Sequence, residues 1–228
     1  MEFKNVLTTF GFENNAGWFN EFLNDQKLWK DVDGWLESDA SIALWAITRS
    51  LNNGIIIEIG TYCGRSTTIL STSAKKNGST VISIDHHIGS IEHAHKGNKY
   101  FRESIGRAFT LPIFSDTFDN KRLFENVIPI VTTSEKAHNL IGSSFEEEKK
   151  KLDFVFVDGD HSYEGCLMDL TLWANLIKKE GFIAVHDSTR PDIERAIKEK
   201  LTSNEWKQIG IFGSLYVATR RTANVENS

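Results

Sequence analysis

The sequence predicts an α/β protein built on a doubly wound sheet of seven strands, mostly parallel, with an antiparallel hairpin at its C-terminal end. Short β-branched runs alternate with helix-length segments, the rhythm of βα units. Several runs are apolar throughout, as in strands that helices cover on both faces. Polar residues close these runs, and doubly wound sheets bind ligands beyond the carboxyl ends of their strands.

The composition is that of a single globular domain. The chain has 228 residues, 40% hydrophobic and 25% charged, and a net charge of −5, which argues against general nucleic-acid binding. It contains no membrane-length apolar run, and its first residues lack a signal-peptide pattern. Cys63 and Cys166 show no metal or redox spacing. We therefore expect a cytoplasmic protein that contacts neither nucleic acid nor membrane and has no disulfide.

Residues 1–53 are expected to form an N-terminal helical cap, and Ala40–Leu51 has apolar residues at helical spacing. The cap carries four of the six tryptophans, and these either cover one face of the sheet or form a lid over a substrate: Trp18, Trp29, Trp35 and Trp45. Trp18 and Trp29 are candidates for both roles. Residues 54–222 should complete the same structural domain as its ligand-binding part, and 223–228 a tail.

The remaining elements follow in order. Strands are expected over the run that begins at Ile55 and over 80–84, 127–131, 153–157, 181–187, 206–211 and 215–219, the last two forming a hairpin. One helix is expected to begin near Ser66 and to end at Asn77-Gly78, and a weak one is expected over 100–109. Another should follow the capping residues 132–134. The last two are expected from about 163 through Ile177 and over 193–201, where Pro191 marks the helix start. The long connection 86–126 should be functional or mobile.

The turn after the first strand is the most informative local feature. Gly60 and Gly64 let the backbone approach a ligand, and a helix that begins near Ser66 offers free amide groups to a carboxylate or phosphate. The spacing departs from the dinucleotide pattern, because Tyr62 stands where a pyrophosphate needs bare backbone. Asp85 closes the second strand, where a carboxylate can accept both ribose hydroxyls. A nucleoside without a pyrophosphate is therefore expected.

Two motifs carry a family resemblance. Residues 58–66, Glu-Ile-Gly-Thr-Tyr-Cys-Gly-Arg-Ser, resemble the first motif of class I S-adenosylmethionine-dependent methyltransferases, in particular the catechol-type, metal-dependent O-methyltransferases. Residues 158–165, Asp-Gly-Asp-His-Ser-Tyr-Glu-Gly, with Asp169, Trp173 and 181–187, resemble enzymes that methylate sugar hydroxyls of macrolides. The resemblance covers about residues 35–190. It implies a Rossmann-like methyltransferase fold, S-adenosylmethionine as cofactor and a small hydroxylated acceptor, with a homo-oligomer possible.

The resemblance also implies roles for individual residues. Ser66 would hold the methionine carboxylate, Asp85 the ribose and Ser134 the adenine edge. Glu58, Gly60 and Gly64 would shape the methionine pocket. The full set expected at the cofactor is Glu58, Gly60, Thr61, Tyr62, Gly64, Ser66, Asp85, His86, Ser134 and Asp158.

His161 is the candidate base, acting with Asp158 on the acceptor hydroxyl; its alternative role is to cap the following helix. Asp158 and Asp187 match the two metal-binding aspartates of the catechol-type enzymes, so Mg²⁺ or another divalent cation is a possible cofactor. Ser188 replaces the asparagine of that family, a weaker ligand for which Asp160 could compensate.

The other histidines are not expected at the chemistry. Strand alternation should turn His186 away from the site. A zinc site is not expected from four histidines of the long connection, whose spacing fits no common pattern: His86, His87, His93 and His95. Two other functions stay open. One is a glycosyl transferase that binds a nucleotide sugar through the Asp-x-Asp-His turn, and the other is a cofactor-binding module without turnover.

Overall fold

The computed structural model describes residues 3–12, 16–90, 94–147 and 151–222. The expected tail 223–228 and His93 lie outside these ranges. No helix in the described ranges is long and apolar enough to cross a membrane.

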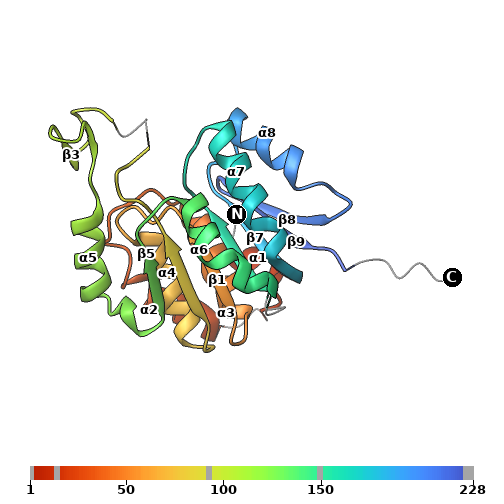
Figure 1. Ribbon diagram of the computed structural model, residues 1–228. Helices are drawn as coiled ribbons and strands as arrows, with labels where there is room; N and C mark the ends of the chain where they lie inside the picture. Colours follow the sequence, from red (N-terminus) through yellow and green to blue (C-terminus); the bar gives the residue numbers. More distant parts are fainter. Residues whose placement is uncertain (1–2, 13–15, 91–93, 148–150, 223–228) are drawn as a thin grey trace.

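A single seven-stranded sheet forms the centre of the molecule, as predicted (Figure 1). Its order is β5-β2-β1-β6-β7-β9-β8, with parallel pairing from β5 to β7 and antiparallel pairing of β9 with both neighbours. The strands are β1 (Ile55–Ile59), β2 (Thr80–Ile84), β5 (Val127–Ile130), β6 (Leu152–Val157), β7 (Ile177–Val185), β8 (Trp206–Phe212) and β9 (Leu215–Arg220). The strand order reverses at β1, so its end and those of β2 and β6 are where a ligand is expected.

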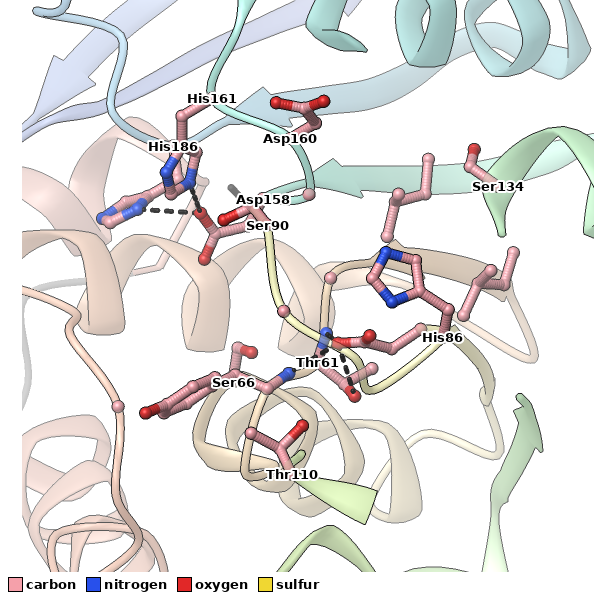
Figure 2. A pocket seen from close by; sticks show the side chains of 18 of the residues that line it. Thr61, Ser66, His86, Ser90, Thr110, Ser134, Asp158, Asp160, His161 and His186 are labelled. Atoms are coloured by element: carbon pink, nitrogen blue, oxygen red, sulfur yellow. Dashed lines mark hydrogen bonds and ion pairs between the residues drawn. The ribbon is translucent and has the colours of Figure 1, made fainter. Parts of the chain in front are cut away.

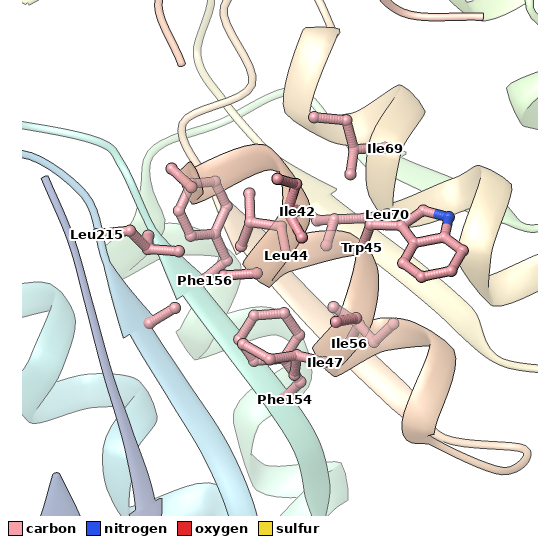
Figure 3. Packing of buried hydrophobic residues seen from close by; sticks show 14 of the residues in the cluster. Ile42, Leu44, Trp45, Ile47, Ile56, Ile69, Leu70, Phe154, Phe156 and Leu215 are labelled. Carbon is pink, nitrogen blue, oxygen red and sulfur yellow. The ribbon is translucent and has the colours of Figure 1, made fainter. Parts of the chain in front are cut away.

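Helices cover both faces of the sheet, which explains the continuous apolar runs of β1 and β6. One core contains residues of α1 (Phe3–Thr9), α3 (Ser38–Ser50) and α4 (Arg65–Lys75) packed on the sheet. Figure 3 shows this core, where Leu44 of α3 lies near Phe156 of β6. The opposite core contains residues of α6 (Ser134–Glu147), α7 (Tyr163–Trp173) and α8 (Pro191–Lys200).

The N-terminal helices share the first core with the sheet. Trp29 and Trp45 are buried, and the Trp45 indole donates to Asp25 at 2.9 Å. Trp18, in the first turn of α2 (Ala16–Gln26), packs edge to face on Trp45. The expected second role of Trp18 and Trp29 over a substrate is therefore wrong. Trp35 alone of the four is strongly exposed, at 71%.

The connection 86–126 differs from the prediction. The helix expected over 100–109 is instead a small hairpin of β3 (Phe101–Arg102) and β4 (Arg107–Ala108). Gly106 adopts φ +64° in its turn, a conformation that a right-handed helix does not contain. The helix of this region is α5 (Leu111–Asn120), with proline in its first turn, followed by a short 3₁₀ helix, η2 (Leu123–Glu125).

The helix expected to reach Ile177 ends earlier. α7 ends at Trp173 and continues as a 3₁₀ turn, η3 (Ala174–Leu176). Ile177 is the first residue of β7, which ends at Val185 rather than Asp187. The last part of the predicted strand, His186-Asp187, is therefore loop.

Candidate active site

A cavity of about 660 Å³ lies beyond the carboxyl ends of β1, β2, β6 and β7. Figure 2 shows two of its ends, with Ser134 and His86 on one side and His161 and His186 on the other. Most residues assigned to the cofactor line it: Gly60, Thr61, Tyr62, Ser66, Asp85, His86, Ser134 and Asp158. The predicted base His161 and the predicted metal ligand Asp187 line the same cavity.

Close backbone packing determines the conformation of the turn that contains Gly60 and Gly64. Gly60 has φ +87°, and a β-carbon there would lie 2.0 Å from the carbonyl oxygen of Asp158. Gly64, at φ +94°, precedes the first residue of α4. Both glycines are thus required by the fold, and Gly60 lets the ends of β1 and β6 meet at the cavity wall.

Asp85 holds this turn in place. Its Oδ2 accepts from the backbone N–H groups of Thr61 at 2.8 Å and Tyr62 at 2.9 Å. Its Oδ1 accepts from the N–H of His87 at 2.6 Å. The carboxylate therefore joins the ends of β1 and β2 as well as facing the cavity, a structural role that the sequence did not reveal. Oδ1 keeps a lone pair for a further donor.

Glu58 lies beneath the turn and does not line the cavity, and neither does Gly64. The glutamate is fully buried, and its Oε2 accepts from the Thr67 hydroxyl at 2.6 Å. Burial raises the pKa of Glu58 to about 8; hydrogen bonds from Ser66 and Thr67 oppose that rise, and the charges of Asp158 and Asp85 add to it. Glu58 thus acts on the shape of the pocket by fixing the start of α4.

Two imidazoles converge on Asp158 (Figure 2). His186 Nδ1 lies 3.0 Å from Asp158 Oδ1, and His161 Nε2 lies 3.4 Å from the same oxygen. The prediction that His186 points away is wrong. Because β7 ends at Val185 and Asp187 has φ +52°, strand alternation no longer governs this residue.

His186 is held from both sides. Its Nε2 lies 3.2 Å from Oε2 of Glu37, the residue that precedes α3, and the Ser214 hydroxyl donates to the same oxygen at 3.1 Å. Burial lowers the pKa of His186, but Asp158, Glu37 and Asp187 together raise it to about 9. Burial would raise the pKa of Asp158, and the two imidazoles bring it below its usual value. An imidazolium beside an ionised aspartate results.

His161 does not cap α7. The cap is Ser162, whose hydroxyl accepts from the N–H of Gly165 at 3.1 Å. His161 instead bridges the two predicted metal ligands, since its Nδ1 lies 3.7 Å from Asp187 Oδ2. The imidazole is therefore placed for chemistry in the cavity.

The side chains here do not fit a hard divalent cation. The Ser188 hydroxyl donates to the carbonyl of Ser214 at 2.7 Å, and Asp160 Oδ1 accepts from the N–H of Ser162. Within the ranges that the structure describes, no three or more His, Cys, Asp or Glu side chains are grouped to hold a metal ion. His186 supplies positive charge between Asp158 and Asp187 instead. The donor set therefore disagrees with the divalent cation that the family resemblance implied.

The histidines of the long connection are separate. His86 lines the cavity, whereas His87 is buried against Phe114, where burial lowers its pKa. His95 is exposed. Neither His87 nor His95 lines the cavity, so the described members form no shared ligand set.

Sequence reasoning did not bring together three aromatic rings, of which Trp35 and Tyr62 line the cavity. Trp35 lies over Tyr62 with ring centroids 5.5 Å apart, and Tyr62 meets Tyr100 at 5.7 Å. The Tyr100 hydroxyl donates to Asp33 at 2.7 Å. The cluster joins the N-terminal segment to the β3–β4 hairpin, a contact that no local pattern announces.

Solved structures of other proteins share this fold. The fold is similar to an O-methyltransferase from Bacillus cereus in complex with SAH (12% identity, TM-score 0.57, 96% of each chain). It is also similar to CalS11, a TDP-rhamnose 3'-O-methyltransferase of calicheamicin biosynthesis (11% identity, TM-score 0.56, 92% of this chain and 96% of that one). A third similar structure is cofactor-bound Rv0187 from MTB, with 11% identity and a TM-score of 0.59 over 91% of each chain. A family model described as a methyltransferase domain matches residues 57–188, and the chain belongs to that methyltransferase family.

Proposed function

We propose that this protein transfers the methyl group of S-adenosylmethionine to a hydroxyl of a small molecule. The observation that carries the proposal is one cavity that joins the Gly60–Gly64 turn to the His161–Asp158–His186 cluster. The family match and the fold shared with O-methyltransferases support it, and favour it over a glycosyl transferase.

The cofactor would lie across the strand ends, held by residues of this chain. Ser66 and the first amide groups of α4 suit the methionine carboxylate. The free lone pair of Asp85 suits a ribose hydroxyl, and Ser134 lies at the adenine end. The cationic sulfonium would then lie near Asp158, whose charge attracts it.

The acceptor hydroxyl would enter between the sulfonium and His161, under Trp35. When bound, the cofactor would supply the methyl group and keep the C–S bonding pair on sulfur, and His161 would take the proton of the attacking hydroxyl. Asp158 orients His161 and balances the imidazolium that forms. Alignment and exclusion of water supply the rest of the acceleration.

The test is calorimetric titration with S-adenosylhomocysteine, followed by transfer of labelled methyl to a panel of sugars, sugar nucleotides and phenols. Binding together with labelled product supports the proposal. Tight binding without product on any acceptor favours the cofactor-binding module. Thermal protection by uridine nucleotides and none by S-adenosylhomocysteine would favour the glycosyl transferase.

A further inference from the structure

Arg65 is a charged residue of the cavity that the proposed mechanism does not use. It is the first residue of α4, is half-buried and lines the cavity. Among the residues that the structure describes, its guanidinium has no carboxylate partner and makes one hydrogen bond, from Nη1 to the carbonyl of Gly34 at 3.0 Å. A partly buried cation without a counter-charge is costly, so this group favours a negatively charged ligand.

Packing against Gly34 fixes the direction of the guanidinium. Gly34 has φ +147°, and a β-carbon there would lie 3.2 Å from Cβ and 3.5 Å from Cδ of Arg65. The stem of the arginine therefore lies directly on the backbone of the segment ahead of Trp35. Nε is buried without a partner, whereas Nη2 is neither buried nor hydrogen-bonded within the described ranges. Arg65 thus offers Nη2 at the cavity wall in an orientation that is already set.

The carboxylates of the cavity do not supply the counter-charge. Asp33, next to Gly34, accepts from the Tyr100 hydroxyl at 2.7 Å and pairs with Lys99 at 2.8 Å. Asp187 pairs with Arg190 at 3.3 Å. The positive charge of Arg65 therefore stays available to a ligand.

A second arginine, Arg107, lines the cavity from the β3–β4 hairpin. It is exposed and forms no ion pair with any residue that the structure describes. Tyr100, at the base of this hairpin, donates to Asp33, and Asp33 precedes the glycine that holds Arg65. The two arginines therefore belong to neighbouring walls of the cavity.

We propose that Arg65, assisted by Arg107, binds an anionic group carried by the methyl acceptor, so that the acceptor is a hydroxylated compound with a phosphate or carboxylate group. The inference rests on the proposed function, because it assumes an acceptor hydroxyl at His161. The acceptor enters under Trp35, and Arg65 holds the segment immediately before that tryptophan. A guanidinium fork matches two oxygens of a phosphate or carboxylate. The methionine carboxylate of the cofactor has partners of its own in Ser66 and the first amide groups of α4.

The first experiment titrates the wild-type protein, saturated with S-adenosylhomocysteine, with pyrophosphate and separately with malonate in a calorimeter. The two probes separate phosphate from carboxylate recognition. We expect at least one to bind with a Kd of about 1 mM or tighter, and Arg65→Gln to bind it at least about tenfold more weakly. The inference is overturned if neither probe binds, or if Arg65→Gln binds as well as wild type, which would mean an adventitious ion only.

Arg102→Gln is the matched control, because Arg102 is exposed, pairs with Arg107 across the hairpin and does not line the cavity. It should bind the probe as wild type does. If Arg65→Gln does not fold, Arg107→Gln takes its place, with at least about threefold weaker binding expected. An unchanged affinity in that variant counts against the inference equally.

A cofactor titration separates the acceptor from the methionine carboxylate. S-adenosylhomocysteine should bind Arg65→Gln within about twofold of its wild-type affinity. A loss of that affinity, with binding of 5'-methylthioadenosine unchanged, would assign the guanidinium to the cofactor and overturn the inference.

Methyl transfer then tests the class of acceptor. Within the matched pairs catechol and 3,4-dihydroxybenzoate, and glucose and glucose 1-phosphate, the anionic member should be the better substrate. Arg65→Gln should raise its KM at least about tenfold and change kcat less than about threefold. Product from neutral acceptors alone would overturn the inference and leave the proposed function intact. Failure of S-adenosylhomocysteine to bind the wild-type protein would overturn both.

Discussion

Two carboxyl groups of the site lie in opposite electrostatic settings. Glu58 has hydroxyl neighbours and the negative charges of Asp158 and Asp85 nearby, and burial favours its protonated form. Asp158 has two imidazoles within 3.4 Å and is held ionised. Residue type alone predicted neither state, since the difference comes from partners that lie on distant elements.

The protonation of Glu58 should be visible in stability. Its pKa is about 8 in the folded protein against an ordinary value of 4.5. Between these pH values the folded chain keeps a proton that the unfolded chain loses, so the free energy of unfolding falls as pH rises, by up to about 1.4 kcal/mol per pH unit. Glu58→Gln should remove the contribution of Glu58 to this slope, leaving that of His186, whose pKa is also raised, and should melt higher than wild type at pH 8.

Urea denaturation at several values from pH 5 to pH 8 measures the effect. Glu164→Gln, at an exposed position of α7, is the control and should follow the wild-type slope. If Glu58→Gln also follows it, the carboxyl group is ionised in the folded state and the prediction is wrong.

His161 is expected to act in the chemical step and not in cofactor binding. His161→Gln should lower kcat about 10²- to 10⁴-fold on an acceptor found in the panel, since it removes the proton acceptor. Its affinity for S-adenosylhomocysteine should stay within about twofold of wild type. His95→Gln, exposed and outside the cavity, controls for the loss of an imidazole. Kinetics near the wild-type rate would exclude His161 as the base.

The strands and the connections between them differ in how far the sequence could predict them. β1, β2 and β6 are short apolar runs that helices cover, so the local pattern located them within one or two residues. The hairpin β3–β4 and the inward turn of His186 escaped prediction, because a turn at Gly106 and the end of β7 at Val185 decide them. Most of the residues expected at the cofactor follow strands and line the cavity. Glu37 and Asp33 come from another part of the chain and were not predicted at the site, whereas Trp35 was one of four tryptophans considered for a lid.

The β1–α4 turn should tolerate no side chain at Gly60. Gly60→Ala would place its β-carbon 2.0 Å from the Asp158 carbonyl, so the end of β1 must separate from β6. We expect a loss of more than about 3 kcal/mol in the free energy of unfolding and at least tenfold weaker S-adenosylhomocysteine binding.

Gly11→Ala separates backbone strain from this clash. Gly11 has φ +81°, and a β-carbon added there would meet no atom of the described residues within 4 Å. Only the left-handed conformation is therefore penalised, by about 1–2 kcal/mol. If Gly60→Ala and Gly11→Ala lost similar amounts of unfolding free energy, close packing against Asp158 would not be what requires glycine at position 60.

At the scale of the whole molecule, the N-terminal segment belongs to the core and to the site at once. α3 buries nine consecutive residues, Ala40–Thr48, against the sheet and α4. Ahead of it, Trp35 and Glu37 reach the cavity and the His186 cluster. Trp29 and Trp45 therefore cover the sheet, and the lid over a substrate stays a prediction for Trp35, which lines the cavity.

A matched pair of tryptophan variants tests this division. Trp45→Ala should lower the free energy of unfolding by about 3–5 kcal/mol, because the ring is fully buried and donates to Asp25. Trp35→Ala should change it by less than about 0.5 kcal/mol, since the ring is 71% exposed, but should raise KM for the acceptor. Thermal melts and acceptor kinetics on both variants measure these effects. A large loss of stability in Trp35→Ala would show that Trp35 also packs in the core.

The contacts of Glu37 determine when the His186 cluster can form during synthesis of the chain. Its carboxylate meets His186 across 149 positions of sequence and Ser214 across 177. A chain emerging from the ribosome exposes Glu37 early and both partners late. The His186 cluster therefore cannot be complete until the β8–β9 turn has been synthesised, which delays assembly of the reactive centre until nearly the whole polypeptide is available to enclose it.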